Sequence, residues 1–363
     1  MIFDSWSDLR PTNMFWQAVA ASITVAAAIL LGSRIPLPGI DTSALVEQMT
    51  YSPNGSLIRF SVVALGIMPL FTVFVYAEIA KLVFPSFFRW QVASPDNAFH
   101  TSMAIKAMIL LIAAVQGYGF TSALTDMGLM KDSPGAVATG VISLVGTSAV
   151  MIWLAGMAHV PYRGGGFWLL LAVSLICAVP ADFIRALDLT RVGAVSIQDW
   201  LIAILSIVLA VAAIVVANLL LCGKKGDAGA EFSLTVLLWP PFLANIVAGY
   251  LLLIPVLFIP DLFAGAPRQL ILFSLISSAV LIPVFVYAYY QLISSVRPEF
   301  AGNETRSVML MVAGIQILVC TGLGIVDYIS DFPIIPDGGM LIVCVTVLLA
   351  LRWSAGGKPA LQT

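Results

Sequence analysis

The stretch from Gly32 to Asp41, with the sequence GSRIPLPGID, follows the first long apolar run and decides how the next part of the fold is built. Its two prolines, within three residues, predict a stiff turn. A second turn signal, Pro-Asn-Gly, follows at 53–55, and a short amphipathic piece occupies 43–49. Irregular backbone near membrane depth is tolerated only where protein or an aqueous cavity covers it. The pattern is typical of a segment in the mouth of a funnel, and an ordinary external loop is the alternative.

The composition around this stretch indicates a membrane protein. Of the 363 residues, 60% are hydrophobic and 10% are charged, whereas a water-soluble domain of this length needs far more charge on its surface. The apolar residues gather in long runs, and each run approaches the ~20 residues with which a helix crosses the hydrocarbon core. Lipid offers the backbone no hydrogen-bonding partner, so these runs are predicted to be helices. The predicted fold class is an all-α polytopic membrane protein.

About ten transmembrane helices are predicted, and the last is short. Their ranges are 14–31, 57–84, 100–124, 136–158, 167–184, 199–221, 233–259, 268–293, 307–326 and 339–353. An even number puts both termini on one side of the membrane. With the N-terminus inside, 11 of the 17 lysines and arginines lie on the cytoplasmic side and 6 lie outside. Basic residues are retained on the cytoplasmic side during insertion, so both termini are predicted to be cytoplasmic.

No part of the sequence predicts an enzyme, a cofactor or a metal site. The net charge of −2 gives no basic surface for nucleic acid. The four cysteines fall in or beside apolar runs and are expected to pack as small hydrophobes. The two histidines lie far apart, without metal-ligand spacing. Asp182 with Arg185, and Asp188 with Arg191, predict an interfacial charged turn at the outer end of the fifth span rather than an acid–base site.

Prolines interrupt two of the predicted spans. Pro69 lies inside the second span, and Pro240 and Pro241 lie near the start of the seventh. If ten spans divide as five plus five, both interruptions fall in the second helix of a half. Interrupted helices at matching positions point toward a functional pathway between the halves. The alternative is that proline is simply tolerated in membrane helices.

Glu78 is the most costly residue in any predicted span, because a carboxylate at membrane depth needs a cavity, a partner or water. Lys81 stands three residues further on the same helical face, where an ion pair can form. Two interpretations are open. Both residues lie near the cytoplasmic interface, where snorkelling makes them ordinary, or Glu78 faces a cavity.

Two motifs near the N-terminus resemble the SecY family of protein-conducting channels. The stretch 32–41 resembles the signature that follows the family's first helix, and 59–69, RFSVVALGIMP, resembles the second-helix motif that follows the plug. Weaker similarities continue at 143–154, 163–166 and 338–343. The chain is identified on these residues as a divergent, loop-shortened member of the SecY/Sec61-alpha family.

The resemblance implies two pseudo-symmetric five-helix halves around an hourglass channel. Residues 1–184 would form the N-terminal half, with helices 1–5 and a plug-like segment at 42–58. Residues 185–353 would form the C-terminal half with helices 6–10, and 354–363 would be a short cytoplasmic tail.

The resemblance also implies which residues close the channel. A ring of bulky apolar side chains seals the family's pore, and such a ring makes physical sense because it dewets and excludes ions. The residues implied for this ring are Ile67, Phe71, Leu171, Leu243 and Ile342. For a lateral gate toward lipid the resemblance implies Thr72 and Gln116, and we add Glu78, Pro240 and Pro241 from the arguments above. Leu237 stands where the resemblance implies a polar gate asparagine.

The cytoplasmic loops depart from the family. SecY carries long, basic loops between helices six and seven and between eight and nine, which dock the ribosome or the motor ATPase SecA. Here these loops are expected at 222–233 and 297–306, with few basic residues. A loop poor in arginine offers little attraction to ribosomal RNA, which argues against docking of the ribosome or SecA.

Three functions are open. The first is a channel for translocation or membrane insertion of polypeptides, accessory and with few substrates, in the bacterial cytoplasmic (inner) membrane. Its expected partners are polypeptide substrates, membrane lipid and SecE/SecG-like subunits, without nucleic acid. The second is a transport or lipid-handling protein that kept the fold and lost translocation, because fold alone does not secure function. The third is an assembly factor for other membrane proteins.

Overall fold

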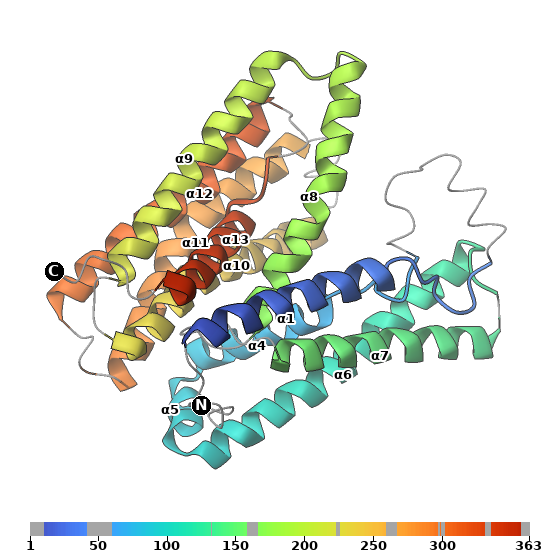
Figure 1. The fold of residues 1–363 in the computed structure, drawn as a ribbon, viewed down its shortest axis with the longest axis horizontal. Helices are drawn as coiled ribbons and strands as arrows, with labels where there is room; N and C mark the ends of the chain where they lie inside the picture. The colour runs from blue at the N-terminus through green and yellow to red at the C-terminus, as the bar shows by residue number, and fades with distance from the viewer. Residues whose placement is uncertain are drawn as a thin grey trace. The chain divides into compact units, whose positions relative to one another are not determined.

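The computed structural model describes residues 11–41, 60–131, 133–157, 166–222, 226–258, 267–296, 298, 302–330 and 335–356. These residues are mainly helical, and the pairing of extended backbone among them is limited to two isolated bridges. The helices, labelled in Figure 1, are α1 (Pro11–Gly32), α4 (Met68–Val83), α5 (Pro85–Ala93), α6 (Pro95–Asp126), α7 (Pro134–Met157), α8 (Phe167–Arg191), α9 (Ile197–Cys222), α10 (Gly226–Phe258), α11 (Pro267–Val296), α12 (Asn303–Ser330) and α13 (Gly338–Gly356).

The helices confirm the predicted all-α membrane class. Within the described residues, seven helices are long and apolar enough to cross a membrane, or eight if α4 and α5 form one bent span. Ala18–Gly32 and Gly338–Leu351 are shorter apolar helices. Each of the ten predicted ranges overlaps one helix, from α1 to α13, and α5 is an additional helix that hydropathy did not predict.

The second span begins later than predicted. Residues 62–67 form consecutive turns, and α4 begins at Met68 rather than near residue 57. Gly66 has a φ of 51°, a left-handed conformation that a glycine adopts readily and that ends regular helix geometry. Pro69 lies in the first turn of α4, where a backbone N–H has no helical partner to lose. The prediction that Pro69 interrupts the second span is therefore wrong, because this proline starts the helix.

The chain turns sharply at Phe84. The axes of α4 and α5 differ by 104° across this residue, whose N–H donates to Ala80 O and ends α4. Pro85 then starts α5, because it has no N–H with which to continue the preceding helix. Near the C-terminal end of α5, Trp90 O accepts a hydrogen bond from Asn97 Nδ2 of α6 at 2.9 Å. The break explains why the predicted second span ended correctly near residue 84.

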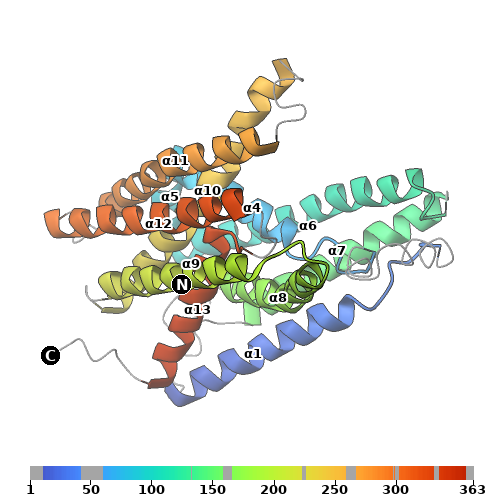
Figure 2. The ribbon, with the colours of Figure 1, turned by 90° about the horizontal axis from the view of Figure 1, so that it is seen from above.

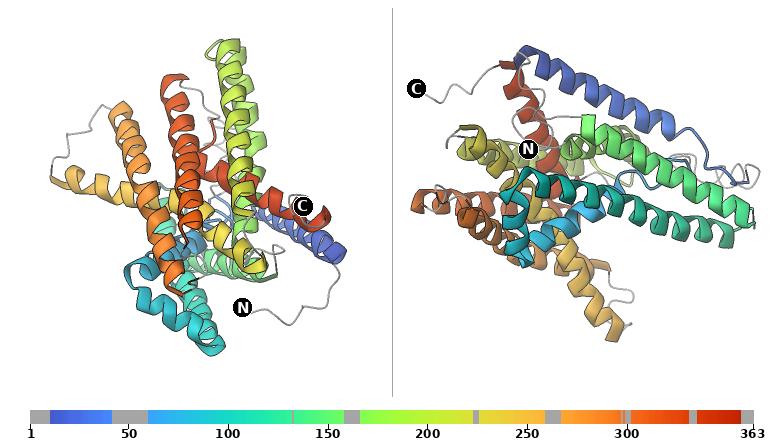
Figure 3. Two further views of the ribbon diagram at one scale, coloured as in Figure 1. Left: turned by 90° about the vertical axis from the view of Figure 1, so that its left-hand side faces the viewer. Right: turned by 90° about the horizontal axis from the view of Figure 1, so that it is seen from below.

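Two compact units make up the chain. The first comprises Met1–His159 and Gly165–Cys177. In it α6 packs along α4 and along α7, its neighbour in Figure 3, and α1 also contacts α7. The buried side of α6 repeats every three or four residues, which is the spacing of one helical face. Its members are Ile109, Ala113, Gly117, Thr121 and Leu124.

The second unit comprises Val160–Gly164 and Ala178–Thr363. In it α11 packs against both α10 and α12, and α9 packs against α12 and α13 (Figure 2). Buried and partly buried polar pairs also join its helices, as is common where lipid supplies no hydrophobic drive for helix association. Asn218 Nδ2 of α9 donates to Thr346 Oγ1 of α13 at 3.1 Å, and Ser278 Oγ of α11 donates to Asn245 Oδ1 of α10 at 2.9 Å. The pseudo-symmetry of the two predicted halves stays a prediction.

The helix α10 corrects two further expectations. It begins at Gly226, so most of the loop expected at 222–233 is helix. The charged residues in 226–233 lower the hydropathy, so the apolar run begins later than the helix. They do not prevent helix formation, because alanine and glutamate both favour a helix. The early start also puts Pro240 and Pro241 in the interior of α10 rather than near its start.

Candidate functional site

The stretch that follows α1 pairs with two other segments. On one side, Leu37 N donates to Phe60 O at 2.9 Å, and Val62 N donates to Ile35 O at 3.0 Å. On the other side, Asp41 N donates to Leu129 O at 2.9 Å, and Lys131 N donates to Gly39 O at 3.1 Å. We call this arrangement the turn clamp: Ile35–Asp41 between Phe60–Val62 and Leu129–Lys131. It satisfies backbone groups that lie outside any helix.

An apolar cluster anchors the turn clamp. Its buried members come from the stretch itself, from the end of α6 and the residues after it, and from α7. They are Leu37, Ile40, Leu124, Leu129, Met130 and Leu144. Each buried aliphatic side chain contributes about 1.5–3 kcal/mol relative to an exposed one. The clamp is therefore part of the core of the first unit rather than an external loop.

Two glycines make room for the turn clamp. Gly39 has a φ of 93°, and a Cβ there would lie 3.1 Å from the Cβ of Ala136. Gly140, on α7, faces the cluster, and a Cβ there would lie 2.8 Å from Thr121 Cγ2 and 3.2 Å from Met130 Cε. Both positions require glycine, one for conformation and space and the other for space alone.

The predicted plug-like segment 42–58 lies outside the described residues. The nearest described residues on either side of it are Asp41 and Phe60, and both belong to the turn clamp. Asp41 is hydrogen-bonded to Leu129, and Phe60 is hydrogen-bonded to Leu37. The two ends of residues 42–59 are thus fixed in one small region of the first unit.

Three candidates for the pore ring lie in the first unit. Ile67 is 8% exposed and precedes α4, and Phe71 N donates to Ile67 O at 2.9 Å. The ring of Phe71 stacks on that of Phe167 at a centroid distance of 6.5 Å. Leu171 is buried one turn beyond Phe167 on α8. The other two candidates, Leu243 and Ile342, are buried in the second unit. The ring of five stays a prediction.

Phe167 is a contact that the sequence interpretation missed. It is 6% exposed, and its ring lies 4.7 Å from that of Phe74 as well as near Phe71. The side chain therefore couples the start of α8 to α4. An aromatic pair, Phe167-Trp168, directly after a run of glycines was the signal that could have identified it.

The gate candidates of the first unit have distinct surroundings. Thr72 Oγ1 donates to Met68 O at 2.8 Å within α4. Gln116 lies on α6, and its Oε1 is buried without a hydrogen-bond partner among the described residues. Pro240 and Pro241 are buried in the second unit. The gate assignment of these residues and of Glu78 stays a prediction.

The ion pair expected between Glu78 and Lys81 is present. Lys81 Nζ lies 2.6 Å from Glu78 Oε1, and Glu78 is 7% exposed. An ion pair with so little solvent differs from one on a surface, because removal of one partner leaves a buried charge. The ion pair thus offsets part of the free-energy cost of burying a carboxylate on α4.

We expect Lys81→Met to lower the free energy of unfolding by about 2 kcal/mol, because a partly buried carboxylate loses its cation. Adding Glu78→Gln should recover most of this loss. Thermal unfolding in detergent measures both variants. Arg185→Met is the matched control, since Arg185 pairs with Asp182 at the same spacing but both side chains are exposed, and its effect should stay below about 1 kcal/mol. If Lys81→Met and Arg185→Met lowered the free energy of unfolding equally, the result would contradict the role of burial.

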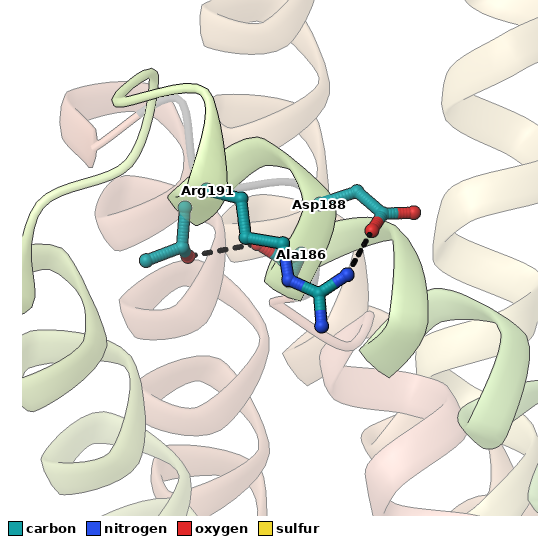
Figure 4. Close-up of polar contacts among 4 residues, drawn as sticks. Ala186, Asp188 and Arg191 are labelled. Carbon is teal, nitrogen blue, oxygen red and sulfur yellow. Dashed lines mark hydrogen bonds and ion pairs between the residues drawn. The ribbon is translucent and has the colours of Figure 1, made fainter.

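The charged residues near the end of α8 form local ion pairs. Arg185 Nη1 lies 3.5 Å from Asp182 Oδ1, and Arg191 Nη1 lies 3.4 Å from Asp188 Oδ1. Figure 4 shows Arg191 beside Asp188 across one turn of the helix. All four side chains are exposed. Within the part of the chain that the structure describes, no group of three or more metal-binding side chains comes together.

Comparison with known protein families relates part of the chain to one family. The SecY family model matches residues 61–222. The curated relatives include the protein translocase subunits SecY of Buchnera aphidicola subsp. Baizongia pistaciae, 26% identical over 183 residues, and of Escherichia coli K12, 25% identical over 179 residues. These matches cover 46% and 45% of this chain but only 42% and 40% of the relatives. The chain thus matches less than half the length of these relatives.

Solved structures extend the similarity to nearly the whole chain. A structure described as a protein-conducting channel has a TM-score of 0.59, and a SecY structure that addresses its plug domain has a TM-score of 0.57. Each is 13% identical, and each alignment covers 94% of this chain and 92% of the other. The fold is that of a multi-pass helical membrane protein, and it is shared with these two structures. Residues 61–222 are thus similar to the SecY family, and the chain as a whole shares the fold of these two solved structures.

Proposed function

We propose that the chain forms a SecY-type channel for translocation or membrane insertion of polypeptides in the bacterial cytoplasmic membrane, with both termini cytoplasmic. The observation that carries this proposal is the turn clamp, which fixes both ends of residues 42–59 in one place. A channel that passes polypeptides must stay closed to ions when it is idle. A segment tethered at both ends can leave the pore and return to it without being lost. Residues 42–58 would act in this way as the plug.

The short cytoplasmic connections favour an accessory role with few substrates. Only residues 223–225 separate α9 from α10, and α11 ends at Val296 before α12 begins at Asn303. Long basic loops are the surfaces that would attract ribosomal RNA, so such short connections argue against ribosome docking, and we extend the same argument to SecA. The proposed partners are polypeptide substrates, membrane lipid and SecE/SecG-like subunits. The driving energy would come from a partner or from the membrane potential.

Cysteine crosslinking to a signal peptide tests the proposed function. We expect a peptide with a cysteine in its apolar core to form disulfides with Thr72→Cys and Gln116→Cys in liposomes, because these side chains would line the gate. All four native cysteines are first replaced by serine or alanine so that each product reports one position. Val115→Cys is the control, because Val115 neighbours Gln116 on α6 and is 63% exposed.

The crosslinking pattern separates the three functions. Disulfides at positions 72 and 116 without one at 115 support the channel. Passage of small solutes with no peptide disulfide would overturn it in favour of a transporter. Disulfides with mature membrane helices alone, and none with a signal peptide, would favour an assembly factor.

A further inference from the structure

Two consecutive prolines remove two backbone donors from the middle of α10. In an α-helix each N–H donates to the carbonyl four residues earlier, so Pro240 leaves Val236 O without its helical donor and Pro241 does the same to Leu237 O. Val236 and Leu237 are 0% and 1% exposed. Water does not reach these carbonyls freely, and an unpaired carbonyl in such a place destabilises the fold.

A glutamine from another helix supplies both missing donors. Gln316, on α12, donates from Nε2 to Val236 O at 3.0 Å and to Leu237 O at 2.8 Å. Its side-chain amide has two hydrogens, one for each carbonyl. The opposite orientation of the amide would put Oε1 against two other oxygens, so the chemistry determines which atom faces α10. Gln316 is itself 0% exposed.

The match between the two prolines and the two acceptors is specific. The carbonyls that Gln316 binds are the two that the prolines leave unpaired, out of the whole backbone of α10. Two other polar links of α10 and α13, Ser278 with Asn245 and Asn218 with Thr346, join one side chain to another rather than to the backbone of α10. Gln316 therefore does more than hold two helices together.

We propose that Gln316 is a positioning residue that completes the proline-broken turn of α10 and thereby sets the direction of the helix beyond it. Leu243 lies within one turn of Pro240 and Pro241, and it is the ring candidate on α10. When the amide leaves the two carbonyls, α10 gains freedom to bend at this turn. A link from this bend to ion sealing rests on the proposed channel function, whereas the link from Gln316 to the prolines does not.

A double-mutant cycle tests the link to the prolines. Gln316→Leu removes the donors with a side chain of similar size and should speed hydrogen exchange of the amides in 242–249 by roughly tenfold, as expected for the loss of buried hydrogen bonds. In a Pro240→Ala/Pro241→Ala background the alanine N–H groups satisfy Val236 and Leu237. Gln316→Leu should there change exchange less than threefold, by the same reasoning on hydrogen-bond strength.

Two further variants keep the cycle interpretable. Thr346→Val removes one hydrogen-bond partner of Asn218, outside α10, and its effect should be the same in both backgrounds. Gln316→Met replaces Gln316→Leu if the latter does not fold, because methionine adapts to irregular space and also lacks donors. Equal effects of the Gln316 substitution in both backgrounds would overturn the proposal, since the glutamine would then act by packing alone.

Ion leak in liposomes separates this inference from the proposed function. If the chain is a channel, Gln316→Leu should raise leak with the native prolines and not with the two alanines. Coupling in hydrogen exchange without any leak, in a preparation whose pore variants also stay sealed, supports the role of Gln316 and contradicts the channel. If Gln316→Leu raises ion leak equally with the native prolines and with the two alanines, the result contradicts the role of Gln316.

Discussion

Gly39→Val is expected to lower the free energy of unfolding by about 3 kcal/mol, because the substitution is penalised twice. A residue with a side chain at a φ of 93° is strained, at a cost of about 1–2 kcal/mol. The added Cβ would also lie 3.1 Å from Ala136 Cβ and 3.3 Å from Ala136 O, on a helix that cannot easily retreat. Unfolding by heat or denaturant in detergent measures the loss.

Gly128→Val separates the two contributions. Gly128 has a φ of 71°, yet a Cβ there would meet nothing within 4 Å. Its substitution should therefore cost the conformational strain alone, about 1–2 kcal/mol. If both valine variants lose the same stability, close packing of the turn clamp against α7 has no energetic weight. If the channel proposal is also correct, Gly39→Val should raise ion leak, and Gly128→Val should not.

Ile67→Gly combined with Phe71→Gly is expected to raise ion leak through reconstituted protein by at least about tenfold. An apolar constriction excludes ions by dewetting, and glycines at these positions would widen it and admit water. A decrease of about 1.4 kcal/mol in a permeation barrier already raises the rate tenfold, which is less than the burial energy of one large apolar side chain. Fluorescent-dye release or single-channel recording in planar bilayers measures the leak.

Phe74→Gly is the matched control for the pore ring. Phe74 lies on α4 beside Phe71 and packs on the same partner, with its ring 4.7 Å from that of Phe167. It does not belong to the implied ring. It should therefore reduce stability as Phe71→Gly does while leaving the leak unchanged. Unchanged conductance of the Ile67/Phe71 variant, in a preparation that a signal peptide can open, would count against the pore-ring assignment.

The spans could be predicted from sequence because hydropathy is a local property. Each apolar run became one helix, and the break after Phe84 followed from Pro85. The start of the second span could not be predicted in this way. Residues 62–67 are apolar because they pack against the turn clamp, and hydropathy does not distinguish a buried turn from a buried helix. A glycine at position 66 was a local sign of the turn, and its positive φ became visible only in the structure.

The contacts of the candidate site were harder to predict, because they join segments that are distant in sequence. Nothing in the sequence of Gly32–Asp41 shows that the backbone of Gly39 and Asp41 will pair with Leu129–Lys131. The double proline of α10 was visible, but the residue that compensates for it lies on α12. A lone glutamine in an apolar span was the available signal, since a buried carboxamide needs partners. Its pairing with Val236 and Leu237 required the structure.

The turn clamp has a consequence for how this protein can change over time. A loop whose two ends are fixed close together can lengthen at little cost, since each doubling of its length adds only about 0.6 kcal/mol of closure entropy. Asp41 and Phe60, which flank residues 42–59, are both hydrogen-bonded within the turn clamp, so a change of length between them is expected to leave the helices in place. We therefore expect the length of residues 42–59 to be open to change at little cost to the stability of the flanking helices.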